Sequence, residues 1–413
     1  RLGLLIGLLL LAYVIKRPMV LIAQEAIEED AITSFDRDHW AYDPIVRPSV
    51  PQIASPEWPQ TDIDSFILSR LEGESLRPAA RAERSTLIRR VCWDLTGLPP
   101  TVHQVNEFID DPDPDAYQRL VDTLLASPEY GTRWAHFWLD LARFAETDGY
   151  EHDKIRKDAW KYRDWVIAAM NNDFPYDKFV RWQIAGDQIE PSNPNAVLAT
   201  AFCLSGPDMP DINSSEERRH VLLNEITSTV TSVVISLQFG CAQCHDHKYD
   251  SISQADFYRL RAFFDASVDL KKNKSVSVLT ALTDAPMSRV MLRGDWRRPG
   301  PTVAAAYPRL LNAADASPDE NVGLRRSLAN WLTSSSHPLT ARVIVNRVWQ
   351  QHFGRGLSTT PSDFGIMGES PTHPKLLDFL ADQLMREGWS LKWLHRKILM
   401  SSTYQTRSTR PSD

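Results

Sequence analysis

Apolar residues recur three or four positions apart along most of this chain, which is the spacing of one buried helix face. Up to residue 267 the pattern predicts helices in these stretches: 61–71, 85–93, 101–109, 117–125, 134–144, 214–237 and 253–264. Capping pairs such as Thr61 with Asp64 and Ser253 with Asp256 mark several of the predicted starts. No stretch before residue 270 alternates as a strand does, so we expect a mainly α protein.

Two segments break the helical pattern. Residues 27–60 are acidic and then rich in proline, which predicts an extended lead-in. Residues 268–323 predict a short, partly extended linker with a turn at Arg293-Gly294-Asp295. The strands predicted in this linker are 276–282 and 290–292. Helical spacing returns at Leu324, so the chain divides into a multi-helix domain and a second, smaller helical domain, with predicted bounds 61–267 and 324–413.

The run Cys241-Ala242-Gln243-Cys244-His245 carries the clearest chemistry. In this Cys-x-x-Cys-His spacing, two thiols bond covalently to a haem and the adjacent imidazole binds its iron. We therefore expect one covalent haem c on Cys241 and Cys244, with His245 as the proximal iron ligand. The helix before the motif is expected to end at Gly240, so that the motif forms a loop between two helices.

Other interpretations of the motif stay open at this point. A zinc site would need two further ligands, and His245 and His247 lie too close in sequence to spread easily around a tetrahedron. A thioredoxin-type dithiol expects a βαβ setting, which the pattern lacks, and a merely structural loop is the remaining alternative. The candidates for a second iron ligand are His220, Met209 and Met287, unless each is packed or at the surface and the iron stays open.

The N-terminus indicates export. Residues 2–15 carry no charge and are followed by Lys16-Arg17, which suits the apolar part of a signal peptide within residues 1–26. An uncleaved membrane anchor through residues 2–23 is the rival interpretation. Because haem c is attached outside the cytoplasm, a periplasmic or otherwise exported location agrees with the motif.

Composition limits the partners and the cysteine chemistry. A net charge of -7 argues against nucleic acid as a partner. With two of the four cysteines assigned to haem, Cys92 and Cys203 remain, either paired with each other or buried as small apolar residues.

Charged and aromatic residues gather between positions 141 and 187. Six of them are candidates for a polar pocket: Arg143, Asp148, Tyr150, Trp160, Arg163 and Asp164. The alternative is a solvated helix face with ordinary ion pairs. Four later histidines lack the local spacing of metal ligands and are predicted at surface or helix-cap positions: His337, His352, His373 and His395.

Several sequence blocks resemble the cytochrome-c-like domain of exported planctomycete proteins. These blocks are 130–134, 143–150, 160–167, 185–187 and 241–250. Further blocks resemble the planctomycete-specific domain that follows it, namely 331–333, 338–349, 353–357, 363–365 and 373–378. The resemblance implies an exported protein with Cys241, Cys244 and His245 on the family's haem-attachment motif. The chain stops soon after Ser402-Thr403-Tyr404, where relatives continue, so we expect the second domain to be incomplete.

The sequence thus predicts an exported c-type haem protein that transfers electrons to or from a redox partner protein. The first alternative is a haem-dependent enzyme acting on an extracellular substrate such as a carbohydrate. The second is a scaffold in which the motif holds a structural metal.

Overall fold

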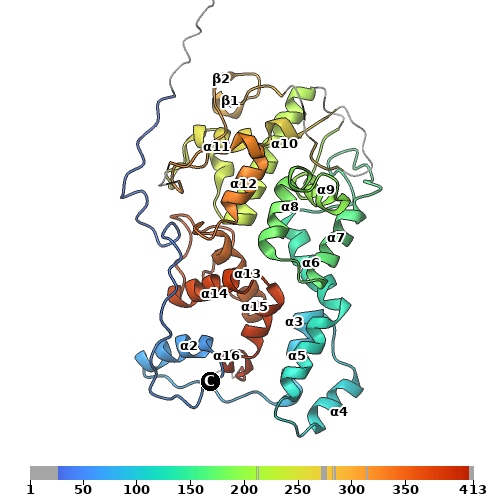
Figure 1. Cartoon of the computed structure of the whole chain (residues 1–413), viewed down its shortest axis with the longest axis vertical. Helices are drawn as coiled ribbons and strands as arrows, with labels where there is room; N and C mark the ends of the chain where they lie inside the picture. The colour runs from blue at the N-terminus through green and yellow to red at the C-terminus, as the bar shows by residue number, and fades with distance from the viewer. Residues whose placement is uncertain are drawn as a thin grey trace, which may run out of the picture.

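The computed structural model describes residues 27–408 except 211, 213, 271–276, 281, 283–284 and 313–314. The predicted signal peptide or anchor therefore lies outside the described residues. The described part is mainly α-helical, as expected, with one small two-stranded sheet (Figure 1). None of its helices combines the length and apolar character that a membrane span requires.

The α-helices are α2 Asp62–Gly73, α3 Arg84–Thr96, α4 Val102–Asp110, α5 Ala116–Ala126, α6 Pro128–Leu141, α7 Trp160–Asn171, α8 Tyr176–Ile189, α9 Pro194–Ala199, α10 Ser215–Val230, α11 Gln254–Arg261, α12 Leu324–Leu332, α13 Thr340–Phe353, α14 Pro374–Arg386, α15 Leu391–Leu399 and α16 Ser402–Gln405.

Local capping chemistry explains why several helices begin where the sequence predicts. Capping boxes form at Thr61, Thr101 and Ser253, where each side chain and the residue three positions on satisfy one another's backbone N–H groups. At the other end of α3, Gly97 takes the left-handed conformation with φ 71°, which glycine adopts without the cost of a side chain. These helix ends depend on neighbouring residues alone.

The sheet is an antiparallel pair of β1 Arg289–Met291 and β2 Pro299–Thr302. The strand predicted at 290–292 and the turn after it are confirmed, because β1 runs into a 3-10 turn at Leu292–Gly294. The strand predicted at 276–282 is not formed over residues 277–280, and the remainder of that run lies partly outside the described residues. Strand β2 was not predicted, because Pro299-Gly300-Pro301 has the composition of a turn.

Helix α10 ends earlier than predicted. The α-helix ends at Val230. A single π-helical turn, Thr231–Ile235, follows it, and Ser236 then takes a left-handed conformation with φ 51°. The buried Arg347 of α13 donates to the carbonyls of Ser232 and Val233, which an α-helix would have used for its own hydrogen bonds. The expected ending at Gly240 was wrong because a distant guanidinium terminates the helix.

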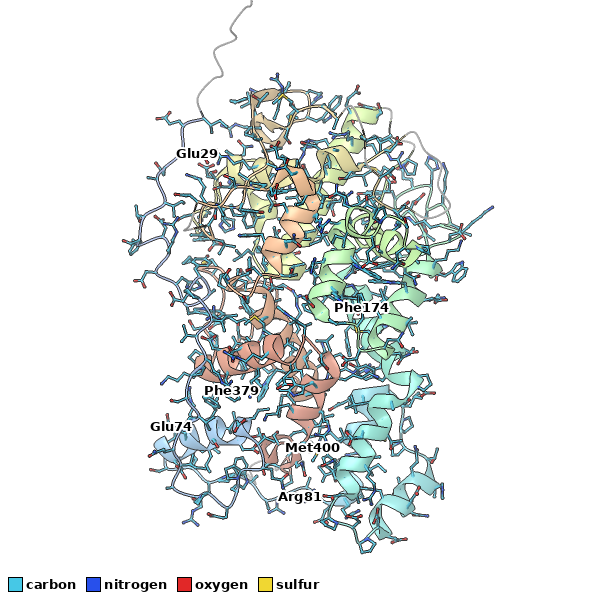
Figure 2. The ribbon with its side chains drawn as sticks, viewed as in Figure 1. Glu29, Glu74, Arg81, Phe174, Phe379 and Met400 are labelled. Atoms are coloured by element: carbon cyan, nitrogen blue, oxygen red, sulfur yellow. The ribbon has the colours of Figure 1, made fainter. Side chains whose placement is uncertain are left out.

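The core runs across the predicted domain bounds. Helix α12 packs on α8, where the fully buried Arg325 forms a bidentate ion pair with Asp187 at 2.7 and 2.6 Å. Helix α2 packs on α14 and α16, and the Phe66 and Phe379 rings are 5.1 Å apart. Figure 2 labels Phe379 at this contact. The C-terminal helices therefore share one apolar core with the helices before residue 270.

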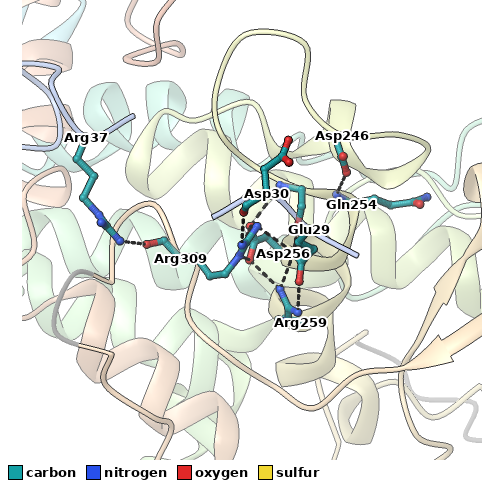
Figure 3. A network of polar contacts seen from close by, with 9 residues as sticks. Glu29, Asp30, Arg37, Asp246, Gln254, Asp256, Arg259 and Arg309 are labelled. Carbon is teal, nitrogen blue, oxygen red and sulfur yellow. Dashed lines mark hydrogen bonds and ion pairs between the residues drawn. The ribbon is translucent and has the colours of Figure 1, made fainter. Parts of the chain in front are cut away.

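The lead-in forms an extended strap down one side of the molecule (Figure 1). Near its start, Glu29 pairs with Arg259 of α11 and, at 2.9 Å, with Arg309 (Figure 3). Arg309 also donates to both carboxylate oxygens of Asp256, which is 1% exposed. Because these charges are paired and partly shielded from water, the strap is fixed to α11 just after the Cys-x-x-Cys-His motif.

Candidate functional site

The Cys-x-x-Cys-His motif lies at the surface. A short 3-10 helix, Phe239–Gln243, carries the first cysteine. Cys241 is exposed and Cys244 is half-buried, and neither is in a disulfide. The imidazole of His245 is exposed beside them. Cys241 and His245 are thus presented toward solvent, while Cys244 is partly covered.

Side chains from two helices hold the motif's backbone. The carbonyl of Gln243 accepts from the Tyr258 hydroxyl and from Nε2 of Gln254, both at 3.0 Å. Its side-chain oxygen accepts from Nδ2 of Asn224 on α10 at 3.1 Å. Oδ1 of Asp246 accepts from the backbone N–H of Gln254 at 2.7 Å, at the positive end of α11 (Figure 3). These contacts fix the loop on both sides of Cys244.

His245 is oriented for ligation. Its Nδ1 lies 2.6 Å from the carbonyl oxygen of Asp246. Because a carbonyl only accepts, Nδ1 carries the proton and the lone pair of the neutral ring is on Nε2. A hydrogen bond from Nδ1 to a backbone carbonyl is a common arrangement for a metal-binding histidine. The motif residues therefore fit a covalently bound haem with His245 as its iron ligand.

The turn after β1 covers Cys244. Gly294 has φ +71°, and a Cβ added to it would lie 2.5 Å from Sγ of Cys244. Gly354 has a similar φ of +74° but open space around it. We expect Gly294→Ala to lower the free energy of unfolding by about 1–2 kcal/mol more than Gly354→Ala, because only the former clashes with the thiol. Urea denaturation of both variants measures the difference, and equal losses would contradict the close contact.

The candidates for a second iron ligand have other surroundings. His220 is buried, and its Nδ1 and Nε2 lie 3.1 Å from Nη1 of Arg261 and 2.9 Å from Nδ2 of Asn224. Both ring nitrogens are thus engaged by protein groups. Met287 is 72% exposed, and Met209 lines a cavity together with Tyr150. None of the three is positioned by these contacts to face His245.

His220 gives the fold a pH dependence. Burial, and then the charge of Arg261, lower the pKa of His220 from 6.5 to about 4. As the pH falls from 6.5 to 4, the unfolded chain binds a proton that the folded chain refuses, so the free energy of unfolding decreases. We expect His220→Gln to flatten this part of the stability profile. The exposed His103→Gln is the control, and an unchanged profile for His220→Gln would refute the assignment.

The residues that follow the motif form a hydrogen-bonded cluster of His247, Asp250, Tyr42 and Ile366, called the clasp below. Nδ1 of His247 accepts from the backbone N–H of Asp250 at 2.9 Å. Oδ1 of Asp250, which is 3% exposed, accepts from the Tyr42 hydroxyl at 3.1 Å and from the N–H of Ile366 at 2.7 Å. Burial and this carboxylate raise the pKa of Tyr42 well above its usual value, so its hydroxyl stays a donor. Asp250 thereby joins the motif, the strap and the C-terminal region.

The contacts of His247 also affect whether this histidine could join the two thiols as a zinc ligand. With Nδ1 of His247 turned toward its own backbone, that atom does not converge with the two thiols. Over the described ranges, no three or more His, Cys, Asp or Glu side chains are grouped so that they could hold a metal ion. Attachment of haem needs only one protein ligand to the iron, so this geometry favours it over a four-ligand site.

The six pocket candidates separate into different places. Asp148 lines a cavity of about 730 Å³, and together with Tyr150 it lines a smaller neighbour of about 370 Å³. Arg143 forms an ion pair with Glu225 of α10. Trp160 is 44% exposed, and Arg163 makes half-exposed ion pairs with Glu146 and Asp164. The structure therefore brings Asp148 and Tyr150 together at a pocket, and places Trp160, Arg163 and Asp164 outside both cavities.

A buried pair of histidines was not predicted from the sequence. Nε2 of His352 lies 2.8 Å from Nδ1 of His395, and the Trp134 and His395 ring centroids are 3.9 Å apart. The surface or cap positions predicted for His352 and His395 were therefore wrong, whereas the buried His337 accepts from the N–H groups of Leu339 and Thr340 at the start of α13, as a cap-forming residue does. His373 does occupy the N-cap position of α14. His352 and His395 are distant in sequence, so no local spacing could have revealed the pair.

Fold and site together define a mainly α-helical protein with an accessible Cys-x-x-Cys-His loop held between two helices and a hairpin. Residues 62–269 match the family model PSCyt2, described as a protein of unknown function (DUF1549), and residues 324–413 match PSD1, a protein of unknown function (DUF1553). Because the first match covers half of the chain, the protein belongs to the PSCyt2 family. The predicted pairing of two planctomycete-type domains is confirmed. No curated protein and no solved structure matches the chain.

Proposed function

We propose that this chain is an exported c-type haem protein that transfers electrons, with one haem bonded to Cys241 and Cys244 and its iron bound by His245. The observation that carries the proposal is the presentation of these three side chains. Neither thiol is in a disulfide, Cys241 is exposed while Cys244 is half-buried beneath the turn at Gly294, and the hydrogen bond from Nδ1 of His245 to Asp246 leaves the lone pair on Nε2 of the exposed ring. A haem bound there would supply one-electron chemistry at its iron.

The protein's own part is to keep the attachment residues in place. Gln254 and Tyr258 hold the carbonyl of Gln243 from α11, and Asn224 holds its side chain from α10. The Asp246 carbonyl fixes the tautomer and orientation of His245. A loop that is restrained in this way changes little between oxidation states, which suits an electron carrier.

Electron transfer is favoured over catalysis by the position of the motif. Cys241 and His245 are exposed, and neither they nor Cys244 line the cavities of about 730 and 370 Å³. A haem attached at such a surface loop would expose one edge of its porphyrin ring to a partner protein. We therefore propose a redox partner protein that docks at this loop.

Spectroscopy of protein matured in a host able to attach haem c tests the proposed function. The expected result is a positive haem stain after denaturation and a low-spin, six-coordinate spectrum on reduction without carbon monoxide binding, which requires a second iron ligand other than His220, Met209 and Met287 as they are placed here. A high-spin iron that binds carbon monoxide would contradict electron transfer and support a haem enzyme. Zinc found by elemental analysis without any haem stain would overturn the proposal altogether.

The export part of the proposal has its own test. The full chain is expected in the periplasmic or membrane fraction, and a chain without residues 1–26 is expected in the cytoplasm without haem. Covalent haem on the cytoplasmic form would contradict the proposed route.

A further inference from the structure

The larger cavity has walls of mixed polarity. It encloses about 730 Å³, a volume typical of small-molecule sites. Apolar side chains such as Phe144, Leu204 and Leu222 form part of the wall. Four basic and four acidic side chains also line it, so the formal charges of the lining cancel.

The guanidinium of Arg156 in this wall is bound by protein groups through all three of its nitrogens. Nε donates to Oδ1 of Asp148 at 2.7 Å, and the two terminal nitrogens donate to the carbonyls of Ser205 and Gly206 at 3.0 and 2.8 Å. Its side chain is 14% exposed. Three of its five N–H donors are therefore already engaged by protein groups.

A second charge in the wall is neutralised in the same way. Nε and Nη2 of Arg218 donate to Oδ1 and Oδ2 of Asp208 at 2.9 and 2.6 Å. The two side chains are 23% and 17% exposed. Because both carboxylate oxygens are occupied, Asp208 is a poor partner for a cationic ligand.

Asp148 offers a carboxylate acceptor to both cavities. Its hydrogen bond from Arg156 uses Oδ1, and its side chain is 16% exposed. The isolated β-bridge between Thr147 and Ile155 and the hydrogen bond from the N–H of Asp208 to the Asp148 carbonyl fix its backbone. Oδ2 is thereby held in place to accept from a ligand hydroxyl.

We propose that this cavity is a binding site for a short neutral saccharide. The formal charges of the lining cancel and both arginines are paired with aspartates, so no net charge favours an anion or a cation, whereas a sugar offers hydroxyls to Asp148 and apolar C–H faces to Phe144 and Leu222. The site is separate from the Cys-x-x-Cys-His motif. Arg218 and Leu222 face the cavity from α10, while His220 and Asn224, two positions further round the helix, face the motif's side.

Ligand-observed NMR and calorimetry on the full chain test the site. The probes are glucose, galactose, xylose and cellobiose, with glucuronate and glucosamine as charged counterparts. We expect at least one neutral probe to bind and both charged probes to bind more weakly. Absence of binding by every neutral probe, or tighter binding of a charged one, overturns the proposal.

Two variants locate the binding. Asp148→Asn keeps an oxygen for Arg156 but removes the carboxylate, so we expect about ten- to hundredfold weaker binding, the value of a hydrogen bond to a charged group. Asp164→Asn, an exposed carboxylate outside the cavity, is the matched control. Leu222→Trp fills the cavity and should abolish binding while near-UV circular dichroism confirms the fold. Unchanged affinity in both cavity variants would refute the site.

Discussion

Replacing both Cys241 and Cys244 by alanine is expected to remove all covalently bound haem from matured protein. The thioether bonds require these two thiols, and the other two cysteines cannot replace them. Cys92 and Cys203 are buried, and burial raises the pKa of their thiols to about 11 and about 12. The readout is the haem stain on denatured protein, normalised to the amount of chain.

The matched controls are Cys92→Ala and Cys203→Ala. Both should keep the full stain, because neither side chain reaches the surface. Each single variant of the motif should retain weakened attachment through the remaining thiol. A full stain in the Cys241→Ala and Cys244→Ala double variant would show that the haem is bonded to other residues.

Replacing Arg325 by methionine is expected to destabilise the fold by about 3–5 kcal/mol, since it leaves a largely buried carboxylate without its partner. Arg325 is fully buried, and Nη1 also donates to the carbonyl of Ile184 at 2.9 Å. The Asp187 side chain is 13% exposed, so little water can take the place of the guanidinium. The shift of the urea midpoint at constant slope measures the loss.

A surface ion pair gives the comparison. Arg163 and Glu146 are 39% and 55% exposed, so Arg163→Met should cost less than about 1 kcal/mol. Removing both buried charges, with Arg325→Met and Asp187→Leu together, should recover part of the lost stability. A small effect of Arg325→Met alone would contradict the view that α8 and α12 are joined by this pair.

The sequence predicted those parts of the fold that depend on neighbouring residues. The capping boxes at Thr61, Thr101 and Ser253 place helix starts within the reach of three residues, and the structure has them there. The early end of α10 could not be predicted. It depends on Arg347, which is more than a hundred residues away in the chain.

The same distinction applies to the site. The Cys-x-x-Cys-His spacing predicts the proposed attachment residues locally, and the structure adds the contacts that hold this loop. Tyr42 and Ile366 meet at Asp250 from distant parts of the chain, so no local sequence pattern predicts the clasp. The charged segment predicted a pocket, yet Asp148 faces a cavity while Arg163 faces solvent. Apolar periodicity predicts which face of a helix is buried. It does not predict whether a polar side chain on the other face lines a cavity or faces solvent.

Mass analysis of the tryptic peptide with residues 220–248 tests the central claim most directly. Trypsin cleaves after Arg219 and Lys248, and no lysine or arginine lies between them, so Cys241, Cys244 and His245 stay on one fragment. For protein matured in a host that attaches haem c, we predict that this peptide carries the added mass of one haem. The same peptide recovered from that protein with two unmodified thiols would contradict the account.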